Sequence, residues 1–156
     1  MTQDEVLQLL VDNRMFLGDY DPAKVSGLTP QWFWDRRVDL IDFRGDLQIR
    51  SKQNCALGFR VRILTASHDF TTGYLGEHVN KYVWIDPNTF IGSFALLYNC
   101  HIQEGAVVAA GAVVRNMIVP PHTMVEGNPA RIVKEFIDGK WIRLGANENL
   151  LRPESG

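Results

Sequence analysis

A pair of positions two residues apart recurs with a six-residue step through most of this chain. In each pair, a small or branched residue stands two positions before an aliphatic one. The pairs are Cys55/Leu57, Val61/Ile63, Val83/Ile85, Thr89/Ile91, Ala95/Leu97, Cys100/Ile102, Ala106/Val108, Ala112/Val114 and Thr123/Val125. Ile49 and Phe43 fit the first position of a pair more loosely, and the step from Leu97 to Ile102 is five residues.

The spacing within and between the pairs predicts the fold class. Residues two apart lie on one face of a β-strand, so each pair indicates a short strand. A step of six suits neither a continuous helix nor a hairpin array, but it suits a coil in which three short strands make one triangular turn. We therefore predict an all-β parallel β-helix, with turns served by Gly92, Glu104, Gly105 and Gly111. The alternative, a Val- and Ala-rich strand pair of an ordinary sheet, does not explain the shared phase.

The periodicity fails between Ile63 and Val83, where the chain reads LTASHDFTTGYLGEHVNKY. A coil that stops and resumes has extruded a loop, and loops on rigid scaffolds often carry function. We predict such a loop over residues 64–82, with His68 at its root and His78 toward its far end. Gly73 and Gly76 predict that its middle is irregular or mobile.

The N-terminal segment has a helical signature. Thr2 and Glu5 form a capping-box pattern ahead of VLQLLVDN, which predicts a short amphipathic helix. The aromatic cluster Trp32, Phe33 and Trp34 is expected to cover the first turn of the coil or to meet a neighbouring subunit.

The C-terminal segment has a hairpin signature. The run RIVKEFIDGKWIRL alternates apolar and polar residues on both sides of Asp138-Gly139. The tail from Ala146 onward is polar and is expected to be loose. We predict one domain over residues 1–156, with an N-terminal helical cap at 1–40, a β-helix at 41–126, and the C-terminal β-hairpin and tail at 127–156.

The residue composition and net charge of the chain limit the kinds of molecule that it is expected to bind. The chain has 156 residues, 46% hydrophobic and 22% charged, with a net charge of -2. This composition predicts a globular domain and favours neither nucleic acid nor membrane insertion. The opening MTQDEVLQLL predicts no signal peptide, so a cytoplasmic location is expected. Cys55 and Cys100 lack metal-type or disulfide-framework spacing, and their inward phase predicts inert core thiols.

Four motifs give the chain a family resemblance. They are RILTASHDF (62–70), YVWI (82–85), GAVVAAGAVV (105–114) and VPPHTMVEGNPARIVK (119–134). With them, the stretch from Cys55 to Lys134 resembles the hexapeptide-repeat acyltransferases, and among these the galactoside, maltose and colanic-acid acetyltransferases. Two turns depart from the family pattern. The turn YNC at 98–100 is one residue shorter than usual, and the turn RNMI after Val114 is interpreted as one residue longer than usual. The resemblance implies a left-handed coil and a homotrimer with active sites between subunits.

The resemblance also implies acetyl transfer from acetyl-CoA, as co-substrate, to a hydroxyl. A hydroxyl is a poor nucleophile at neutral pH and needs a positioned base, for which a histidine is suited. His68 is the catalytic candidate, and Asp69 could orient it. The other histidines, His78, His101 and His122, are interpreted as structural or solvent-facing.

Coenzyme A needs a groove of accessible backbone and cations for its phosphates. The residues that match the family's coenzyme region are Trp84, Ala109, Ala110, Gly111, Ala112, Arg115, Arg131 and Lys134. For the basic residues a solvated surface charge is the alternative, and for Trp84 a buried or interface position. No metal is expected.

The predicted function is an acetyl-CoA-dependent O-acetyltransferase that acts on a sugar or polysaccharide hydroxyl by direct transfer. Its expected partners are a coenzyme A thioester and a sugar acceptor. An N-acyltransferase on an amino sugar, free or nucleotide-linked, remains an alternative that would use the same histidine. There are two further alternative functions. One is a zinc-dependent protein like the γ-carbonic anhydrases, and the other is a non-enzymatic β-helix assembly protein.

Overall fold

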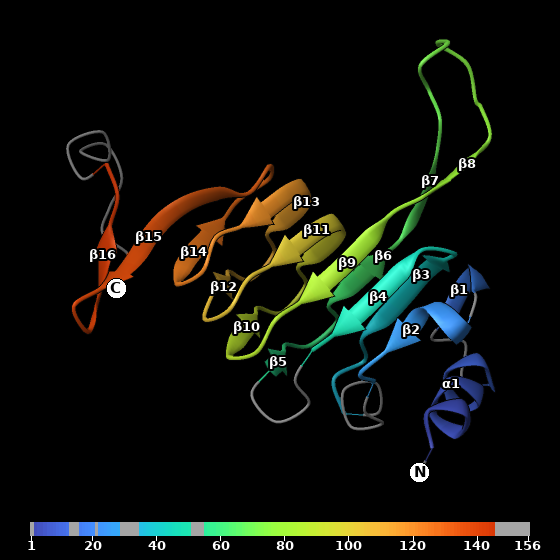
Figure 1. Ribbon diagram of the computed structural model, residues 1–156, viewed down its shortest axis with the longest axis horizontal. Coiled ribbons are helices and arrows are strands. Elements are labelled where there is room, and N and C mark those ends of the chain that lie inside the picture. The colour runs from blue at the N-terminus through green and yellow to red at the C-terminus, as the bar shows by residue number, and fades with distance from the viewer. Residues whose placement is uncertain (1, 13–15, 21, 29–34, 51–54, 146–156) are drawn as a thin grey trace.

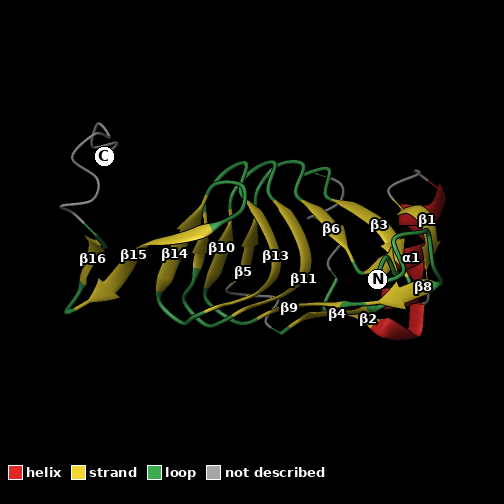
Figure 2. Ribbon diagram, turned by 90° about the horizontal axis from the view of Figure 1, so that it is seen from above, coloured by secondary structure: helices red, strands yellow, loops and turns green. Residues whose placement is uncertain are grey.

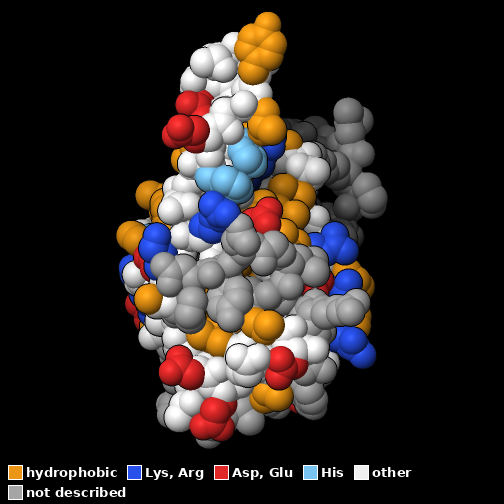
Figure 3. All heavy atoms as spheres, turned by 90° about the vertical axis from the view of Figure 1, so that its right-hand side faces the viewer, with side chains coloured by type: hydrophobic (Ala, Val, Ile, Leu, Met, Phe, Trp, Pro, Cys, Tyr) orange, Lys and Arg blue, Asp and Glu red, His pale blue; other side chains and the backbone are white. Residues whose placement is uncertain are grey.

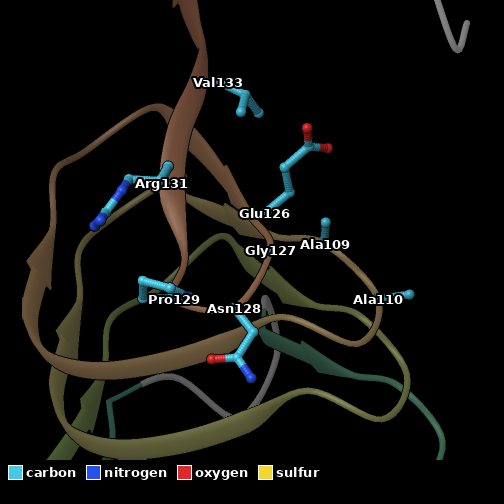
Figure 4. A pocket seen from close by; sticks show the side chains of 8 residues that line it. All are labelled: Ala109, Ala110, Glu126, Gly127, Asn128, Pro129, Arg131 and Val133. Atoms are coloured by element: carbon cyan, nitrogen blue, oxygen red, sulfur yellow. The ribbon is translucent and has the colours of Figure 1, made fainter. Parts of the chain in front are cut away.

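The computed structural model describes residues 2–12, 16–20, 22–28, 35–50 and 55–145. The body is a stack of coils, with helix α1 (Gln3–Asp12) at one end and the hairpin of β15 (Arg131–Ile137) and β16 (Lys140–Arg143) at the other (Figures 1 and 2). Seen along the stack, each coil is triangular (Figure 4). Within the ranges just given, no helix combines the length and the apolar character that a membrane crossing requires.

Three faces of parallel strands make up the coil. The first face contains β1 (Phe16–Tyr20), β3 (Asp39–Phe43), β6 (Arg62–Leu64) and the first halves of β11 (Leu96–Ile102) and β13 (Val113–Val119). The second face contains β2 (Val25–Ser26), β4 (Asp46–Ile49), β9 (Tyr82–Ile85) and the second halves of β11 and β13. The third face contains β5 (Cys55–Leu57), β10 (Thr89–Ile91), β12 (Val107–Val108) and β14 (Thr123–Glu126). A 3-10 turn, η1 (Pro22–Lys24), precedes β2.

The interior is made of the pairs that the sequence predicts. Every residue of the nine predicted pairs is buried. Parallel pairing places equivalent residues directly above one another, as in the ladder Leu40, Ile63, Leu97 and Val114. Burying such aliphatic side chains stabilises the fold by roughly 1.5–3 kcal/mol for each. The predicted β-helix is therefore confirmed.

Two positions near the start of the coil differ from their predicted phase. Ile49 is the second member of its pair, because Leu47 and Ile49 align with Val83 and Ile85. Phe43 is buried at the end of β3, beyond Leu40, and is not the first member of a pair. The reason is that the steps between second members are long here: Leu40 and Ile49 are nine residues apart and Ile49 and Leu57 are eight apart, against six in the regular coil.

The irregular turn after Leu97 recurs one coil later. β11 and β13 pair without a break from Leu97↔Val114 through Cys100↔Met117, so both corners are short in the same way. The interpretation of RNMI as a longer turn is therefore wrong. Asn99 and Asn116 occupy these corners with φ of 45° and 52°, a region that asparagine tolerates. The Asn99 side-chain amide donates a hydrogen bond to Asn116 Oδ1 at 2.8 Å.

The N-terminal cap follows its predicted signature. Glu5 N–H donates to Thr2 Oγ1 at 3.2 Å, and Val6, Leu7 and Leu10 on α1 are buried in the core. Parallel pairing begins ahead of residue 41, because β1 pairs with β3 and β2 pairs with β4. The cluster Trp32, Phe33 and Trp34 lies outside the described residues.

The C-terminal hairpin is confirmed. β15 runs antiparallel to β14 and then pairs antiparallel with β16. The turn residues Asp138 and Gly139 have φ of 50° and 77°, the positive values that a two-residue hairpin turn favours. The tail from Ala146 lies outside the described residues.

Candidate active site

The predicted loop at 64–82 is an ordered arm. Its strands β7 (Ala66–His68) and β8 (His78–Asn80) form an antiparallel pair that projects from the corner between the first and second faces (Figure 1). At the root, Lys81 N–H donates to Thr65 O at 2.7 Å, which brings the two ends of the arm together. Gly45 N–H donates to Thr65 Oγ1 at 3.0 Å, so the arm root rests on the preceding coil. A Cβ on Gly45 would lie only 1.9 Å from Lys81 O, which explains the glycine.

The far end of the arm is a compact turn, where the sequence predicted an irregular segment. Gly76 N–H donates to Asp69 O at 2.8 Å, and Gly73 N–H donates to Phe70 O at 2.9 Å. Gly73 has a φ of 83°, which suits glycine. The tip exposes the apolar side chains of Phe70, Tyr74 and Leu75.

The two histidines of the arm face each other. His68 and His78 are cross-strand partners, and their ring centroids lie 4.2 Å apart with an interplanar angle of 37°. His68 is half-buried, whereas His78 is exposed. In Figure 3 the histidine side chains gather below the apolar tip, where the arm meets the body.

One hydrogen bond sets the chemistry of His68. Its Nδ1 lies 2.9 Å from the carbonyl oxygen of Gly76. Because a carbonyl only accepts, Nδ1 carries the proton, and the neutral ring keeps its lone pair on Nε2. His68 is thus held in the tautomer in which Nε2 can act as a base.

Asp69 does not orient His68 in this structure, although the sequence suggested that it could. The Asp69 carboxylate instead accepts the backbone N–H of Thr71 at 2.8 Å, and this bond holds the pKa of Asp69 below its usual value. Adjacent residues in an extended segment point to opposite sides, which explains the separation. The Gly76 carbonyl takes the role that was considered for Asp69.

A pocket of about 480 Å³ lies near the C-terminal end of the body (Figure 4). This is the size range of small-molecule sites. The lining residues are Ala109, Ala110, Glu126, Gly127, Asn128, Pro129, Arg131 and Val133. They belong to the corner where the third face turns into the first, together with the start of β15.

Small residues and a sharp turn shape this corner. Ala109 N–H donates to Val125 O at 2.9 Å, which stacks one corner on the next. Gly127 has a φ of 94°, and the Asn128-Pro129 peptide is cis. In Figure 4, Ala109 and Ala110 project from one coil while β15 carries Arg131 past the turn. The pocket therefore combines small side chains with one cation, Arg131, and one carboxylate, Glu126.

The predicted coenzyme residues separate into those that line the pocket and those that do not. Ala109, Ala110 and Arg131 line it, and Gly111 is exposed at the same corner. The side chain of Ala112 is fully buried in the core and cannot contact a ligand, which corrects its assignment. Ala112 is the first member of the predicted pair Ala112/Val114, and the inward direction of such pairs already implied that its side chain is buried.

The remaining three lie elsewhere in the chain. Arg115 is exposed at the corner next to Asn116, and Lys134 lies further along β15, opposite Arg143. Neither lines the pocket.

Trp84 is on the second face. Its Nε1–H donates to Asp46 Oδ2 at 2.8 Å, and the guanidinium of Arg50 lies 4.8 Å from the centre of its ring. His101 contacts the ring by its edge and binds Asp86 at 2.8 Å. Within one chain this tryptophan is therefore part of a surface network away from the pocket.

Sequence reasoning missed several pocket residues. Asn128 and Pro129 both shape the turn after β14 and line the pocket. Glu126, Gly127 and Val133 were not singled out. The sequence GNPAR is part of the family motif, but only the crossing of β15 shows that a pocket forms beside it.

The arm and the pocket do not meet within one chain. The arm leaves between β6 and β9 (Figure 1). The pocket is lined by residues that follow β12 and β14, at a different corner and further along the stack. No residue of the arm lines the pocket. A site that used both would need two copies of the chain.

The two cysteines are core thiols. Burial raises the pKa of Cys100 to about 12 and also raises that of Cys55, as expected from their inward phase. Among the residues that the structure describes, no group of three or more His, Cys, Asp or Glu could hold a metal ion.

Known acetyltransferases resemble this chain over part of its length. No family model matches it. A Schizosaccharomyces pombe protein assigned as an acetyltransferase is 36% identical over 86 residues, which covers 53% of this chain and 41% of that protein. Serine acetyltransferase 4 of Arabidopsis thaliana is 36% identical over 88 residues, covering 55% of this chain and 23% of that enzyme. The chain thus spans less than half the length of these curated relatives.

Two solved structures extend the likeness to three dimensions. A maltose O-acetyltransferase from Clostridium difficile is 28% identical, with a TM-score of 0.56 over 65% of this chain and 55% of that one. An N-acyltransferase from Bacillus cereus, in complex with coenzyme A and a dTDP-linked amino sugar, has a TM-score of 0.50 at 16% identity and covers 86% of this chain and 89% of that one. The second shows the fold alone. In its six-residue coil, and in sequence over about half of its length, this chain resembles the hexapeptide-repeat acetyltransferases.

Proposed function

We propose that the protein transfers an acetyl group from acetyl-coenzyme A to a hydroxyl of a sugar or polysaccharide. The observation that carries the proposal is His68, whose Nδ1 bond to Gly76 O leaves Nε2 as the basic nitrogen. The likeness to a maltose O-acetyltransferase supports a sugar hydroxyl as the acceptor.

In the proposed reaction, Nε2 of His68 removes the proton of the acceptor hydroxyl while that oxygen attacks the thioester carbonyl. A C–O bond forms, and the C–S bond then breaks to release the coenzyme thiolate. The proton on Nε2 passes to this thiolate, so the histidine returns to its starting state. Positioning both substrates together removes much of the barrier, and no covalent enzyme intermediate is needed.

The pocket is the proposed coenzyme site. Backbone groups around Ala109, Ala110 and Gly111 would lie along the pantetheine arm, and Arg131 would pair with a phosphate. The Bacillus cereus structure with the same fold holds coenzyme A, which supports a coenzyme site on this type of coil.

The proposed active form is a homotrimer in which His68 of one copy faces the pocket of the next. The support is the separation of the arm from the pocket within a single chain. An isolated copy would hold the base and the coenzyme wall at different corners.

The test is release of free thiol from acetyl-coenzyme A in the presence of a panel of sugars. We expect His68→Ala to lower kcat by about 10²- to 10⁴-fold, the usual contribution of a general base. His122→Asn is the matched control, because His122 is an exposed histidine outside the arm and its φ of 54° suits asparagine. Equal rates for wild type and His68→Ala would remove His68 from the mechanism.

The panel also separates the other functions. If only amino sugars support turnover, the protein is an N-acyltransferase and the proposed O-acetyltransferase function is wrong. Stoichiometric zinc in the purified protein would favour the carbonic-anhydrase-like alternative. Assembled protein without any turnover would favour a role as an assembly part.

A further inference from the structure

The His68–His78 contact occurs at the one kind of sheet position that brings side chains closest. Asp69 N–H donates to Glu77 O at 2.8 Å, so Asp69 and Glu77 form a hydrogen-bonded pair. The neighbouring pair in an antiparallel ladder, His68 and His78, is then non-hydrogen-bonded, with the shorter distance between strands. The ring separation of 4.2 Å follows from this register.

His68 needs a second contact if its base nitrogen is to keep one direction. The bond from Nδ1 to Gly76 O anchors one point of the ring. A single hydrogen bond of a half-exposed ring still allows the ring to tilt about it. The face of the His78 ring restricts this tilt, while Phe70, with its centroid 6.5 Å away, is a looser neighbour.

The geometry does not suit proton transfer between the two imidazoles. The N–H bonds and lone pairs of an imidazole lie in the plane of its ring, and these two planes are tilted by 37° with their centroids 4.2 Å apart. Centroids this close bring the rings into contact through their faces, so their nitrogens do not point at each other. The contact is therefore mechanical and does not make His78 a second base.

We infer that His78 is a positioning residue, which holds the His68 ring by stacking so that Nε2 keeps the direction required of a base. This inference rests on the proposed function of His68. It assigns a role to a side chain that the sequence alone left as structural or solvent-facing. A planar ring at position 78 is the requirement, and the imidazole nitrogens are not.

The kinetic test compares His78→Ala with His78→Phe. Loss of the ring should lower kcat about tenfold with KM for both substrates unchanged, since a displaced catalytic group loses rate and not substrate binding. Phenylalanine restores a stacked face and should stay within about twofold of wild type. A drop in His78→Phe as large as that in His78→Ala would show that the nitrogens matter and would overturn the inference, as would an unchanged kcat in His78→Ala.

A second readout does not depend on turnover. Long-range ¹H–¹⁵N correlation spectra report which nitrogen of His68 carries the proton. Wild type and His78→Phe should show the Nδ1–H form, whereas His78→Ala should show a mixture of tautomers. An unchanged His68 signal in His78→Ala overturns the inference even if the protein proves not to be an acetyltransferase. Full activity in His68→Ala would instead contradict the proposed function and leave the spectra to decide on His78.

Discussion

At the scale of single residues, contacts made after folding determine the reactivity of the side chains. The Gly76 carbonyl selects the tautomer of His68, although Gly76 lies eight positions away in the sequence. Cys100 shows the opposite case, in which burial suppresses reactivity. Its side chain is fully buried, and this burial raises the pKa of its thiol to about 12. A core thiol of this kind has no role as a nucleophile.

The raised pKa of Cys100 predicts a change of stability at alkaline pH. In the unfolded chain the thiol ionises near its ordinary value of 9.0, while in the folded protein it stays protonated up to about 12. The protonated Cys100 thiol thus makes its full contribution to the free energy of unfolding below pH 9. This contribution declines as the pH rises toward 12, by about 1.4 kcal/mol per pH unit.

Urea denaturation of wild type and Cys100→Ala between pH 8 and pH 11 measures this contribution. The free energy of unfolding of wild type should fall more steeply above pH 9 than that of the variant. Parallel curves would show that Cys100 ionises in the folded state as it does in water.

At the scale of elements, the arm depends on its root more than on its tip. A Cβ on Gly45 would lie 1.9 Å from Lys81 O and 2.4 Å from Thr65 O, so the root leaves no room for a side chain. A Cβ on Gly73, near the tip, would have nothing within 4 Å, and only the φ of +83° disfavours another residue there. The two glycines are therefore required for different reasons.

This difference predicts unequal costs for two alanine substitutions. Gly45→Ala should lower the free energy of unfolding by about 2–3 kcal/mol, because backbone must move. Gly73→Ala should cost about 1 kcal/mol, from backbone strain alone. Chemical denaturation of both variants gives the comparison, and a larger loss in Gly73→Ala would contradict the described root of the arm.

At the scale of the whole molecule, the body is elongated and the histidine arm projects from one side of it (Figure 1). The pocket lies at a different corner of the coil. A β-helix is a stiff scaffold whose corners keep their places along the stack. A chain of this kind cannot bend to bring the arm to its own pocket. An assembly of parallel copies can bring the arm of one to the pocket of another.

Subunit mixing tests this arrangement. His68→Ala removes the base, and Ala110→Trp fills the pocket, so each variant alone should be inactive. If each site combines two copies, random mixed assemblies should regain about one quarter of wild-type activity, because that fraction of sites receives both intact parts. Light scattering checks that the mixed species is a trimer. An inactive mixture of properly assembled variants would place the base and the pocket in the same copy.

Local patterns were sufficient to predict the fold and the position of His68 on a segment that leaves the coil. Pairs such as Ala106/Val108 show their inward phase because burial in a strand follows a period of two, and Asp138-Gly139 shows its hairpin because a tight turn needs particular residues. The predicted phase near Ile49 was wrong because Ile49 and Leu57, which are second members of consecutive pairs, are eight residues apart instead of six, and this displaces the pattern ahead of Leu57.

The sequence by itself determined the coil, its terminal hairpin and the position of His68 on a segment that leaves the coil, since each depends on neighbours within a few residues. Only the tertiary structure decided that Gly76 and His78 hold His68, that Asn99 and Asn116 form matching corners, and that β15 completes a pocket over Ala109 and Ala110. Those contacts join residues from different strands or coils, and their distances depend on how corners stack and strands return, which no local pattern encodes.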